Sequence, residues 1–262
     1  MPRPPQPIRS DLGWSTTDRI TVRGVDLCNE VIGHLNLGDM AFLELTGRKP
    51  TARESTLFNA ITVTLVEHGI TPSAIAARMT IAGAPEALQA AVAAGLCGLG
   101  SVFVGSMEHA AVMLEQALPY GQDHAGADLD RLAAGIVERH RADKRIVPGL
   151  GHPIHKPVDP RVPRLFAIAQ ETGFSGRYVE LMKRVQARAE TAAGRALPMN
   201  ATGAIGALAC ELGFPPRSVR GLGVLARAIG LVGHIMEEAE RPMALELWRR
   251  TDEEIGAAHR DG

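Results

Sequence analysis

The sequence predicts an almost entirely α-helical protein, and two features of the 262-residue chain carry this prediction. Aromatic residues make up only 4% of the chain although hydrophobic residues reach 45%, so the core must consist of aliphatic side chains that suit close-packed helices. Apolar residues also recur at intervals of three and four, and no run of alternating polar and apolar residues is long enough for a strand. We therefore expect about ten to twelve helices of ordinary length.

Helix signals follow one another along most of the chain. Thr51 is a good N-cap, Pro72 stands in a first helical turn, and a long Ala-rich helix is expected from about Ala87 to Val104. The first twenty residues are expected to form an extended arm, and the charged tail after Leu247 is expected to fray. The predicted helices span residues 26–35, 40–45, 51–68, 72–79, 87–104, 106–118, 128–142, 162–172, 176–193, 201–212 and 216–240.

Composition argues against several classes of function. The net charge is −1 at pH 7, so we expect no nucleic-acid partner. The N-terminal segment lacks the apolar region of a secretory signal, and glycines interrupt the longest apolar stretch, so we expect no membrane span. The three cysteines are far apart and form no CxxC pair, which indicates reduced thiols in a cytoplasmic protein: Cys28, Cys97 and Cys210.

A Pro- and Gly-rich stretch over residues 146–163 is the most informative segment. Residues 147–161 read VPGLGHPIHKPVDPR and bring two imidazoles, an ammonium and a guanidinium into one loop between helices. Its glycines let another molecule approach the backbone and its N–H groups, Arg161 can hold a carboxylate with two hydrogen bonds, and His152 can donate a proton. This pattern predicts a site for an anionic ligand; the alternative is a structural connector with incidental histidines.

Other candidate residues lie outside this loop. His68 stands at a helix C-terminus, where the helix dipole favours its protonated form. Three polar residues share one helix face at spacings of seven and three, with a partly buried polar stripe as the alternative: Arg227, His234 and Glu237. His152 and His155 could suggest a metal site, but no cysteine or further carboxylate cluster lies near them in sequence, so we expect no metal.

These motifs resemble those of the citrate synthase superfamily, above all the short citryl-CoA lyases and the citrate-synthase-like module of ATP-citrate lyase. PGLGH at 148–152 followed by DPR at 159–161 resembles the family signature PGxGH…DPR. Further elements match in the same order: LTG at 45–47, EHG at 67–69, Arg78, the R-x-x-G-x-x-x-H element at 227–234, and RP at 241–242. The likeness covers roughly Arg23 to Leu245.

The resemblance implies an all-α, citrate-synthase-like fold with a cleft between two domains. The large helical domain would comprise residues 1–105 together with 201–262, and the small helical domain residues 106–200. Such a fold implies a homodimer that binds an acyl-CoA and a carboxylate as small-molecule substrates, with closure of the cleft excluding water.

The resemblance also implies roles for individual residues. Arg161 and Arg227 would hold substrate carboxylates, Arg241 would do so across the dimer interface, and His152 and His68 would contact the substrate. Coenzyme A would lie along the loop at Val147, Pro148, Gly149, Leu150, Gly151 and Lys156.

Two positions depart from the family pattern. NATG at 200–203 puts Thr202 where the family carries a catalytic aspartate, and Phe103 takes the place of a catalytic histidine of the synthases. The related lyase module tolerates an aromatic residue at the second position. A threonine hydroxyl is not basic near neutral pH, so Thr202 cannot serve unaided as a general base. Candidates to replace the carboxylate are, in falling order, His155, Glu108 and Glu67.

Three functions follow from these observations. The first is cleavage of a hydroxy-carboxyl-acyl-CoA to acetyl-CoA and an oxo acid, as in a citryl-CoA lyase. The second is a changed reaction on an acyl-CoA within the same scaffold, and the third is binding of an acyl-CoA or carboxylate without catalysis. A helical interaction protein without a ligand is a further alternative, which the loop signature disfavours.

Overall fold

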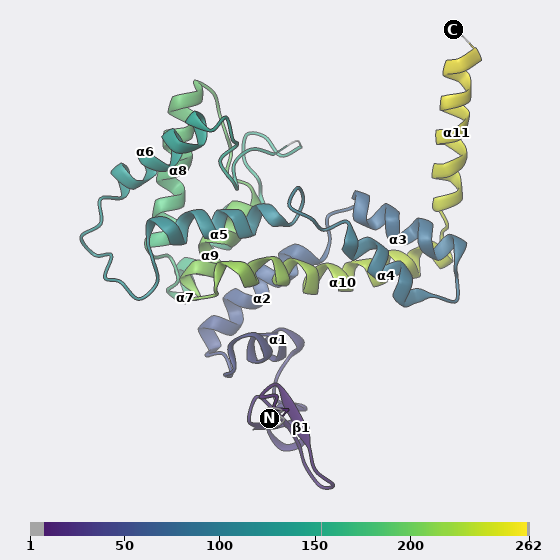
Figure 1. Cartoon of the computed structure of the whole chain (residues 1–262), viewed down its shortest axis with the longest axis horizontal. Coiled ribbons are helices and arrows are strands. Elements are labelled where there is room, and N and C mark those ends of the chain that lie inside the picture. Colours follow the sequence, from purple (N-terminus) through teal and green to yellow (C-terminus); the bar gives the residue numbers. More distant parts are fainter. Residues whose placement is uncertain (1–7, 153, 261–262) are drawn as a thin grey trace, which may run out of the picture.

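The computed structural model describes residues 8–152 and 154–260 (Figure 1). This part of the chain contains eleven α-helices and one small sheet, which confirms the all-α fold class. The helices are α1 (Leu37–Thr46), α2 (Ala52–Val66), α3 (Pro72–Gly83), α4 (Leu88–Cys97), α5 (Gly105–Ala117), α6 (Leu129–Ala142), α7 (Arg161–Thr172), α8 (Arg177–Ala193), α9 (Ala201–Glu211), α10 (Pro216–Glu240) and α11 (Ala244–Arg260).

The main body is built around one hydrophobic cluster to which α1, α2, α5 to α9 and the first half of α10 contribute. Phe42, Phe58 and Phe214 meet in it, with ring centroids 5.3 to 5.5 Å apart. Almost all other members are aliphatic, as the scarcity of aromatic residues predicts. The cluster takes residues from both predicted domains, and the division into 1–105 with 201–262 and 106–200 stays a prediction.

Helix α10 connects the main body to the smaller α3–α4 unit (Figure 1). Its second half forms a separate small cluster with α3 and α4, made of Ala77, Ala91, Leu231 and Ile235. Among the described residues, α10 is the one helix long and apolar enough to cross a membrane, but half of its most apolar window is buried in the protein. A central helix that packs on several neighbours has the same composition.

Gly230 sets the crossing between α10 and the end of α2. A Cβ atom at this position would lie 2.0 Å from the carbonyl oxygen of Val66, so a larger residue would force the helices apart. The close approach brings Glu67, which follows α2, within 3.9 Å of Arg227 and 3.1 Å of His234 on α10. The glycine therefore assembles one side of the site described below.

The N-terminal segment differs from the predicted extended arm. Strands β1 (Gly13–Ser15), β2 (Ile20–Val22) and β3 (Val25–Asp26) form an antiparallel sheet. Arg23 and Gly24 join β2 to β3 with φ of 50° and 79°, as a type I′ turn requires. Strands of two or three residues are too short to show alternation, so periodicity misses them. Residues 1–7 of the predicted arm lie outside the described residues.

Four predictions about helices are also wrong. Helix α4 ends at Cys97, and turns over residues 98–104 replace the rest of the expected long helix. A π-helical turn, η1 (Leu27–Val31), stands at the first predicted helix, and α1 begins at Leu37 because the Asn36 side chain caps it. The tail after Leu247, expected to fray, belongs to helix α11.

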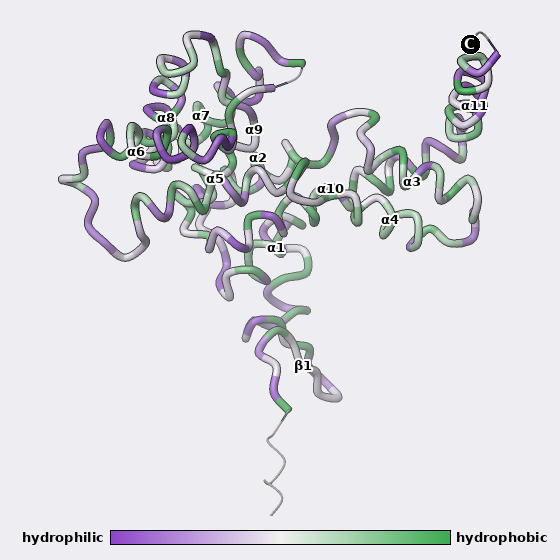
Figure 2. Tube along the Cα trace, turned by 45° about the horizontal axis from the view of Figure 1, so that its top comes forward, coloured by the Kyte–Doolittle hydropathy of each residue, from purple (hydrophilic) through white to green (hydrophobic). Residues whose placement is uncertain are grey.

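Helix α11 projects from the body, and only Ala244 among its residues is buried (Figure 1). Figure 2 shows both polar and hydrophobic residues around it. Ion pairs one turn apart stabilise it in solvent, since Arg249 contacts Glu246 and Glu253, and Arg250 contacts Glu246. The charge of this tail predicted fraying, whereas the spacing of its charged residues by three and four favours a helix.

We expect Gly230→Ala to lower the free energy of unfolding by about 2 kcal/mol, because the added methyl group overlaps the backbone of α2. Gly233→Ala on the same helix is the matched control. A Cβ there meets nothing within 4 Å, so better helix propensity should raise the free energy of unfolding by about 1 kcal/mol. Urea titration of both variants measures the difference, and effects of the same sign would contradict the account.

Candidate functional site

A cavity of about 590 Å³ brings half of the predicted site residues together. It lies between the α2–α3 connection, the turns before α5, the loop after Pro148, the start of α9 and the middle of α10. The predicted residues that line it are His68, Phe103, Gly151, His152, Arg161, Thr202 and Arg227.

Several predicted residues do not line this cavity. Arg241 is exposed at the end of α10, where it pairs with Glu237 of the same helix. Leu150 is buried in the core, and Val147 packs against it half-buried. Lys156 is exposed. Arg241, Val147 and Lys156 could therefore contact a ligand only outside this cavity.

Two glycines fix the loop against α9. Gly149 has a φ of 83°, and a Cβ on it would lie 2.3 Å from the Cα of Gly203. The prediction that both loop glycines admit an outside molecule is therefore wrong at Gly149, whose neighbour is the chain itself. Gly151, also at a φ of 83°, has open space beside it and lines the cavity.

The loop is also bonded to the segment before α9. The N–H of Gly151 donates to the carbonyl oxygen of Pro198 at 2.7 Å, and the side-chain amide of Asn200 donates to the carbonyl oxygen of Gly151 at 2.7 Å. Leu150 and Met199 form a β-bridge. The N–H groups of Leu150 and Gly151 are thus used inside the protein, whereas the sequence analysis expected the loop to offer its N–H groups to a ligand.

Asp159 orients the arginine of the site. Its fully buried carboxylate accepts hydrogen bonds from Nε of Arg161 at 2.9 Å, from a terminal guanidinium nitrogen of Arg161 at 2.7 Å, and from the N–H of Ala201 at 3.0 Å. Burial raises the pKa of this carboxyl, but the hydrogen bonds from Arg161 outweigh it and bring the pKa to about 2. Asp159 is therefore charged, and the sequence analysis assigned it no role of its own.

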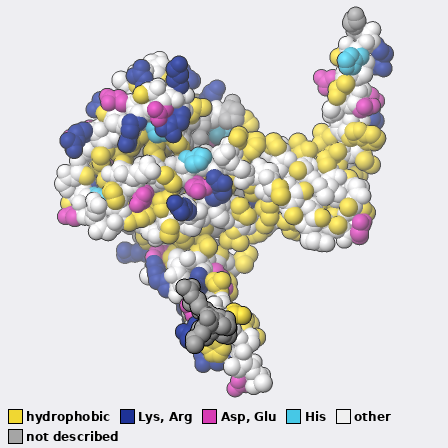
Figure 3. Space-filling model, viewed as in Figure 1, with side chains coloured by type: hydrophobic (Ala, Val, Ile, Leu, Met, Phe, Trp, Pro, Cys, Tyr) yellow, Lys and Arg dark blue, Asp and Glu magenta, His cyan; other side chains and the backbone are white. Residues whose placement is uncertain are grey.

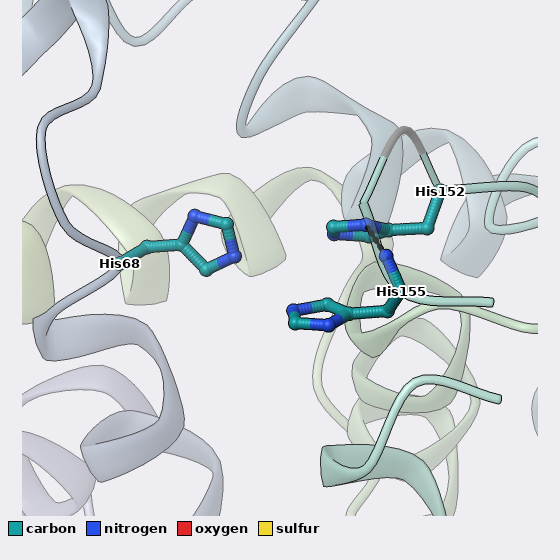
Figure 4. Close-up of side chains that lie close together, drawn as sticks. All are labelled: His68, His152 and His155. Carbon is teal, nitrogen blue, oxygen red and sulfur yellow. Dashed lines mark hydrogen bonds between the residues drawn. The ribbon is translucent and has the colours of Figure 1, made fainter.

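Three imidazoles meet at the edge of the cavity (Figure 4). His68 comes from the α2–α3 connection, and His152 and His155 come from the loop. Ring centroids are 5.9 Å apart for His68 and His152, 6.2 Å for His68 and His155, and 4.4 Å for His152 and His155. One ring nitrogen of each residue lies within 4.8 Å of the others. The family resemblance assigned His68 and His152 to the same substrate site, and the fold shows that the His68 ring lies beside the loop pair.

The charges around this histidine cluster favour an anion over a metal ion. Nδ1 of His152 accepts hydrogen bonds from the N–H groups of Ile154 at 3.1 Å and His155 at 3.0 Å, so the proton of the neutral ring lies on Nε2. Metal binding at Nε2 would need its lone pair, and Arg161, whose guanidinium lies 3.5 Å away, would repel a cation. We therefore keep the prediction that no metal binds here.

The histidines facing the cavity are held neutral. Burial lowers the pKa of His68, and the guanidinium groups of Arg161 and Arg227 lower it further. Burial and the neighbouring His155 lower the pKa of His152. The prediction that a helix dipole favours protonated His68 is wrong, since burial and two nearby cations outweigh that dipole.

No Asp or Glu is among the described residues that line the cavity. The hydroxyl of Thr202 donates to Oδ1 of Asn200 at 2.6 Å, within the N-cap of α9. Glu108 pairs with Arg220 at 2.5 Å. Glu67 accepts hydrogen bonds from the N–H groups of the two residues that follow it. Neither candidate carboxylate lines the cavity, and both have partners in the structure: Arg220 for Glu108, and His68 and Arg227 for Glu67.

A buried polar network supports the α10 side of the cavity. Arg78 of α3 is 1% exposed and donates to Glu238 at 2.8 Å and to Nδ1 of His234 at 3.0 Å. The other ring nitrogen of His234 lies 3.1 Å from Glu67. His234 thus belongs to a buried polar stripe, which was the alternative to a functional role. Its contact with Arg78 was not predicted.

A second cavity, of about 690 Å³, lies between α5, α6 and residues 142–148. Pro148 contributes to its lining, so the two cavities are on neighbouring parts of the same loop. Basic and imidazole side chains outnumber the single acid in its lining: His109, Arg139, His140 and Arg145 against Asp143. An anionic group fits this surface.

Comparisons with known proteins agree with this geometry. The family profile described as Citrate synthase, C-terminal domain, matches residues 34–250. The structure of citryl-CoA lyase from Hydrogenobacter thermophilus is similar with a TM-score of 0.79 and 32% sequence identity, over 89% of this chain and 87% of that one.

Two larger relatives contain a region like this chain. ATP-citrate synthase beta chain protein 2 from Arabidopsis thaliana is 26% identical over 265 residues, which cover 94% of this chain and 42% of that protein. ATP citrate lyase from Methanothrix soehngenii, solved with citrate and coenzyme A, shares the fold at a TM-score of 0.73 and 20% identity, over 91% of this chain and 40% of that one. The chain thus spans less than half the length of either.

We expect the protein to lose stability as the pH falls from about 7.5 to about 5.5. His68 and His152 have pKa values below the ordinary 6.5, so in this range the unfolded chain binds more protons than the folded one. The contribution of these two histidines to the free energy of unfolding is complete above pH 6.5, and it is lost as the pH falls through their lowered pKa values. Thermal unfolding across this range should show a smaller loss in a His68→Gln, His152→Gln double variant, and an unchanged loss would contradict the account.

Proposed function

The chain belongs to the citrate synthase family, and we propose that it cleaves a citryl-CoA-like hydroxy-carboxyl-acyl-CoA to acetyl-CoA and an oxo acid. The observation that carries this proposal is the likeness to the citryl-CoA lyase of Hydrogenobacter thermophilus over nearly the whole of both chains. The chemistry of the cavity supports it, because guanidinium groups and neutral imidazoles line a space large enough for a polycarboxylate.

In this proposal Arg161 and Arg227 bind the carboxylates of the acyl group. Arg161 is held by Asp159 and is partly exposed, so it can take a carboxylate without losing its own partner. His152, with its proton on Nε2, donates a hydrogen bond to the hydroxyl oxygen that becomes the oxo group. His68 donates to a carboxylate from the opposite side.

Cleavage transfers one proton from oxygen to carbon. The hydroxyl loses its proton, its C–O bond becomes a C=O bond, and the adjacent carbon–carbon bond breaks. The electron pair of that bond passes to the acetyl-CoA fragment as an enolate, whose methylene carbon then takes a proton. The guanidinium groups and the His152 donor stabilise the negative charge that develops on oxygen.

Coenzyme A extends, in this proposal, along the loop from the first cavity to the second. Gly151 leaves open space at the first cavity, and Pro148 lines the second. On α5, His109 in the second cavity follows Ser106 in the first by one helical turn. The basic lining of the second cavity suits the phosphates, and exposed Lys156 lies on the same loop.

A homodimer is part of the same proposal. Figure 3 shows hydrophobic side chains spread over the α3, α4 and α10 region. Leu88, Ile229 and Met236 are exposed there, and Leu245 and Trp248 are exposed on projecting α11. Apolar surface of this kind marks an interface, and an isolated 17-residue helix is only marginally stable in water. A second copy of the chain covers these faces and receives Arg241 in its cavity.

A second candidate is an acyl-CoA or carboxylate-binding protein without catalysis. The absence of any carboxylate from the described cavity lining, with Thr202 in place of an acid, favours this candidate. A changed reaction on an acyl-CoA stays open for the same reason. All three functions use the same anion site, so only turnover separates them.

Localisation and partners complete the proposal. We keep a cytoplasmic location, with neither nucleic acid nor a membrane as partner. The three cysteines, Cys28, Cys97 and Cys210, are free, which is compatible with a reducing compartment.

The decisive assay incubates the purified protein with citryl-CoA and follows acetyl-CoA and oxaloacetate. We expect both products, and we expect Arg161→Lys to raise KM by about tenfold because lysine cannot form the paired hydrogen bonds. Arg164→Lys, an exposed arginine on the same helix, should leave KM unchanged. Micromolar binding of coenzyme A by calorimetry without product formation would reject the lyase and leave the binding protein.

Mixing two inactive variants tests the contribution of Arg241. If Arg241 enters the partner's cavity, a mixed dimer of Arg241→Ala and Arg227→Met chains has one cavity with both arginines. Random mixing should then restore about a quarter of the wild-type activity. Sedimentation provides the oligomeric state, and mixed samples with no recovery would show that Arg241 does not act across the interface.

A further inference from the structure

Cleavage to acetyl-CoA requires a side chain that can carry a proton near neutral pH, since the enolate carbon must be protonated. The described lining of the first cavity contains no Asp, Glu, Lys, Cys or Tyr side chain. In this lining, the Thr202 hydroxyl donates to Asn200, and the guanidinium groups of the arginines do not give up protons near neutral pH. The remaining proton carriers are the three clustered imidazoles. His68 and His152 line the cavity, and His155 does not line it but lies against His152 with ring centroids 4.4 Å apart.

The backbone engages Nδ1 of His152, which leaves its Nε2–H free to donate to a substrate. Nδ1 accepts two backbone hydrogen bonds, and Nε2–H faces the region of the Arg161 guanidinium. Taking a second proton at Nδ1 would break the turn at Ile154 and His155. His152 is therefore suited to donate a hydrogen bond to substrate and is poorly suited to shuttle a proton.

His68 lies in the field of two fixed positive charges. Arg161 and Arg227 both act on its ring, so its protonated form is disfavoured from two sides. Its main chain is also tied to Glu67, which accepts from the N–H of His68 at 2.9 Å. His68 is suited to hold a carboxylate as a neutral donor.

His155 differs from both. Its ring is half-buried, overlaps His152 at a centroid distance of 4.4 Å, and points toward His68 across the gap in Figure 4. Among the described residues, no hydrogen bond is formed by its ring nitrogens. The charged or titratable groups around it are His68, His152, Asp159, Arg161 and the adjacent Lys156.

We propose that His155 is the acid–base residue of the cleavage, an assignment that rests on the proposed function. Its neutral ring takes the hydroxyl proton as the carbon–carbon bond breaks, and the resulting imidazolium returns that proton to the methylene carbon of the enolate. One N–H bond forms and then breaks, one C–H bond forms, and no other reactant is consumed. The donor and acceptor atoms of the substrate are separated by a single carbon, so one imidazole can serve both.

The experiment compares His155→Gln with the wild type in two assays. The first is the single-turnover rate of citryl-CoA cleavage, and the second is exchange of the acetyl-CoA methyl protons with deuterium oxide in the presence of the oxo acid. We expect both rates to fall by about 100-fold or more, while the Kd for coenzyme A changes by less than about threefold. His34→Gln, an exposed histidine outside both cavities, is the matched control and should change neither rate.

Two further measurements separate proton transfer from a structural role. Added imidazole should restore part of the rate in His155→Ala, and the acid limb of the wild-type pH–rate profile should disappear in His155→Gln. His68→Gln should instead raise the KM more than it lowers kcat, because it binds a carboxylate.

Three results would overturn the assignment. His155→Gln could keep both rates within about threefold of wild type, or lose affinity and rate to the same extent. A chelator could abolish wild-type cleavage and Zn²⁺ restore it, which would make the histidine cluster a metal site. Failure of the wild type to cleave or exchange would reject the proposed function itself, and with it this role, even where coenzyme A still binds.

Discussion

The buried carboxylate of Asp159 is the interaction on which the cavity depends. It joins the end of the loop to the start of α7 through Arg161 and to the start of α9 through the N–H of Ala201. Removing Arg161 would leave the buried charge of Asp159 without its main partner, which destabilises the fold. The close packing of Gly149 on Gly203 also holds the loop against α9. Charge and packing together therefore determine the position of His152.

The net charge of −1 conceals a strongly polarised interior. Arg161 and Arg227 reach the first cavity from α7 and α10. Asp159, which orients Arg161, is fully buried, whereas Glu67 beside Arg227 is half-exposed. Burial and neighbouring cations lower the pKa of His68 and of His152, which favours their neutral forms. An enzyme that cleaves a polyanion needs this division, in which fixed cations bind and neutral imidazoles handle protons and hydrogen bonds.

Much of the fold follows from local signals in the sequence. Thr51 forms a complete capping box with Glu54, and Pro72 opens α3, so these helix starts are predicted correctly. The misses have physical causes: β1 to β3 are too short for periodicity, and α11 depends on ion-pair spacing. The loop and the family motifs indicated His152 and Arg161. The family motifs also assigned His68 to the substrate site. The neighbour of Gly149 and the partner of His234 required the fold, since neither pair is close in sequence.

The two guanidinium groups that face one cavity from different helices have a consequence for the empty protein. The two like charges repel each other, and Asp159 and Glu67 offset this repulsion in part. A bound polycarboxylate would be attracted to both guanidinium groups. Affinity must therefore depend on ionic strength, rising as salt is diluted. The field of the two guanidinium groups therefore favours an anion over a cation or a neutral molecule in this cavity.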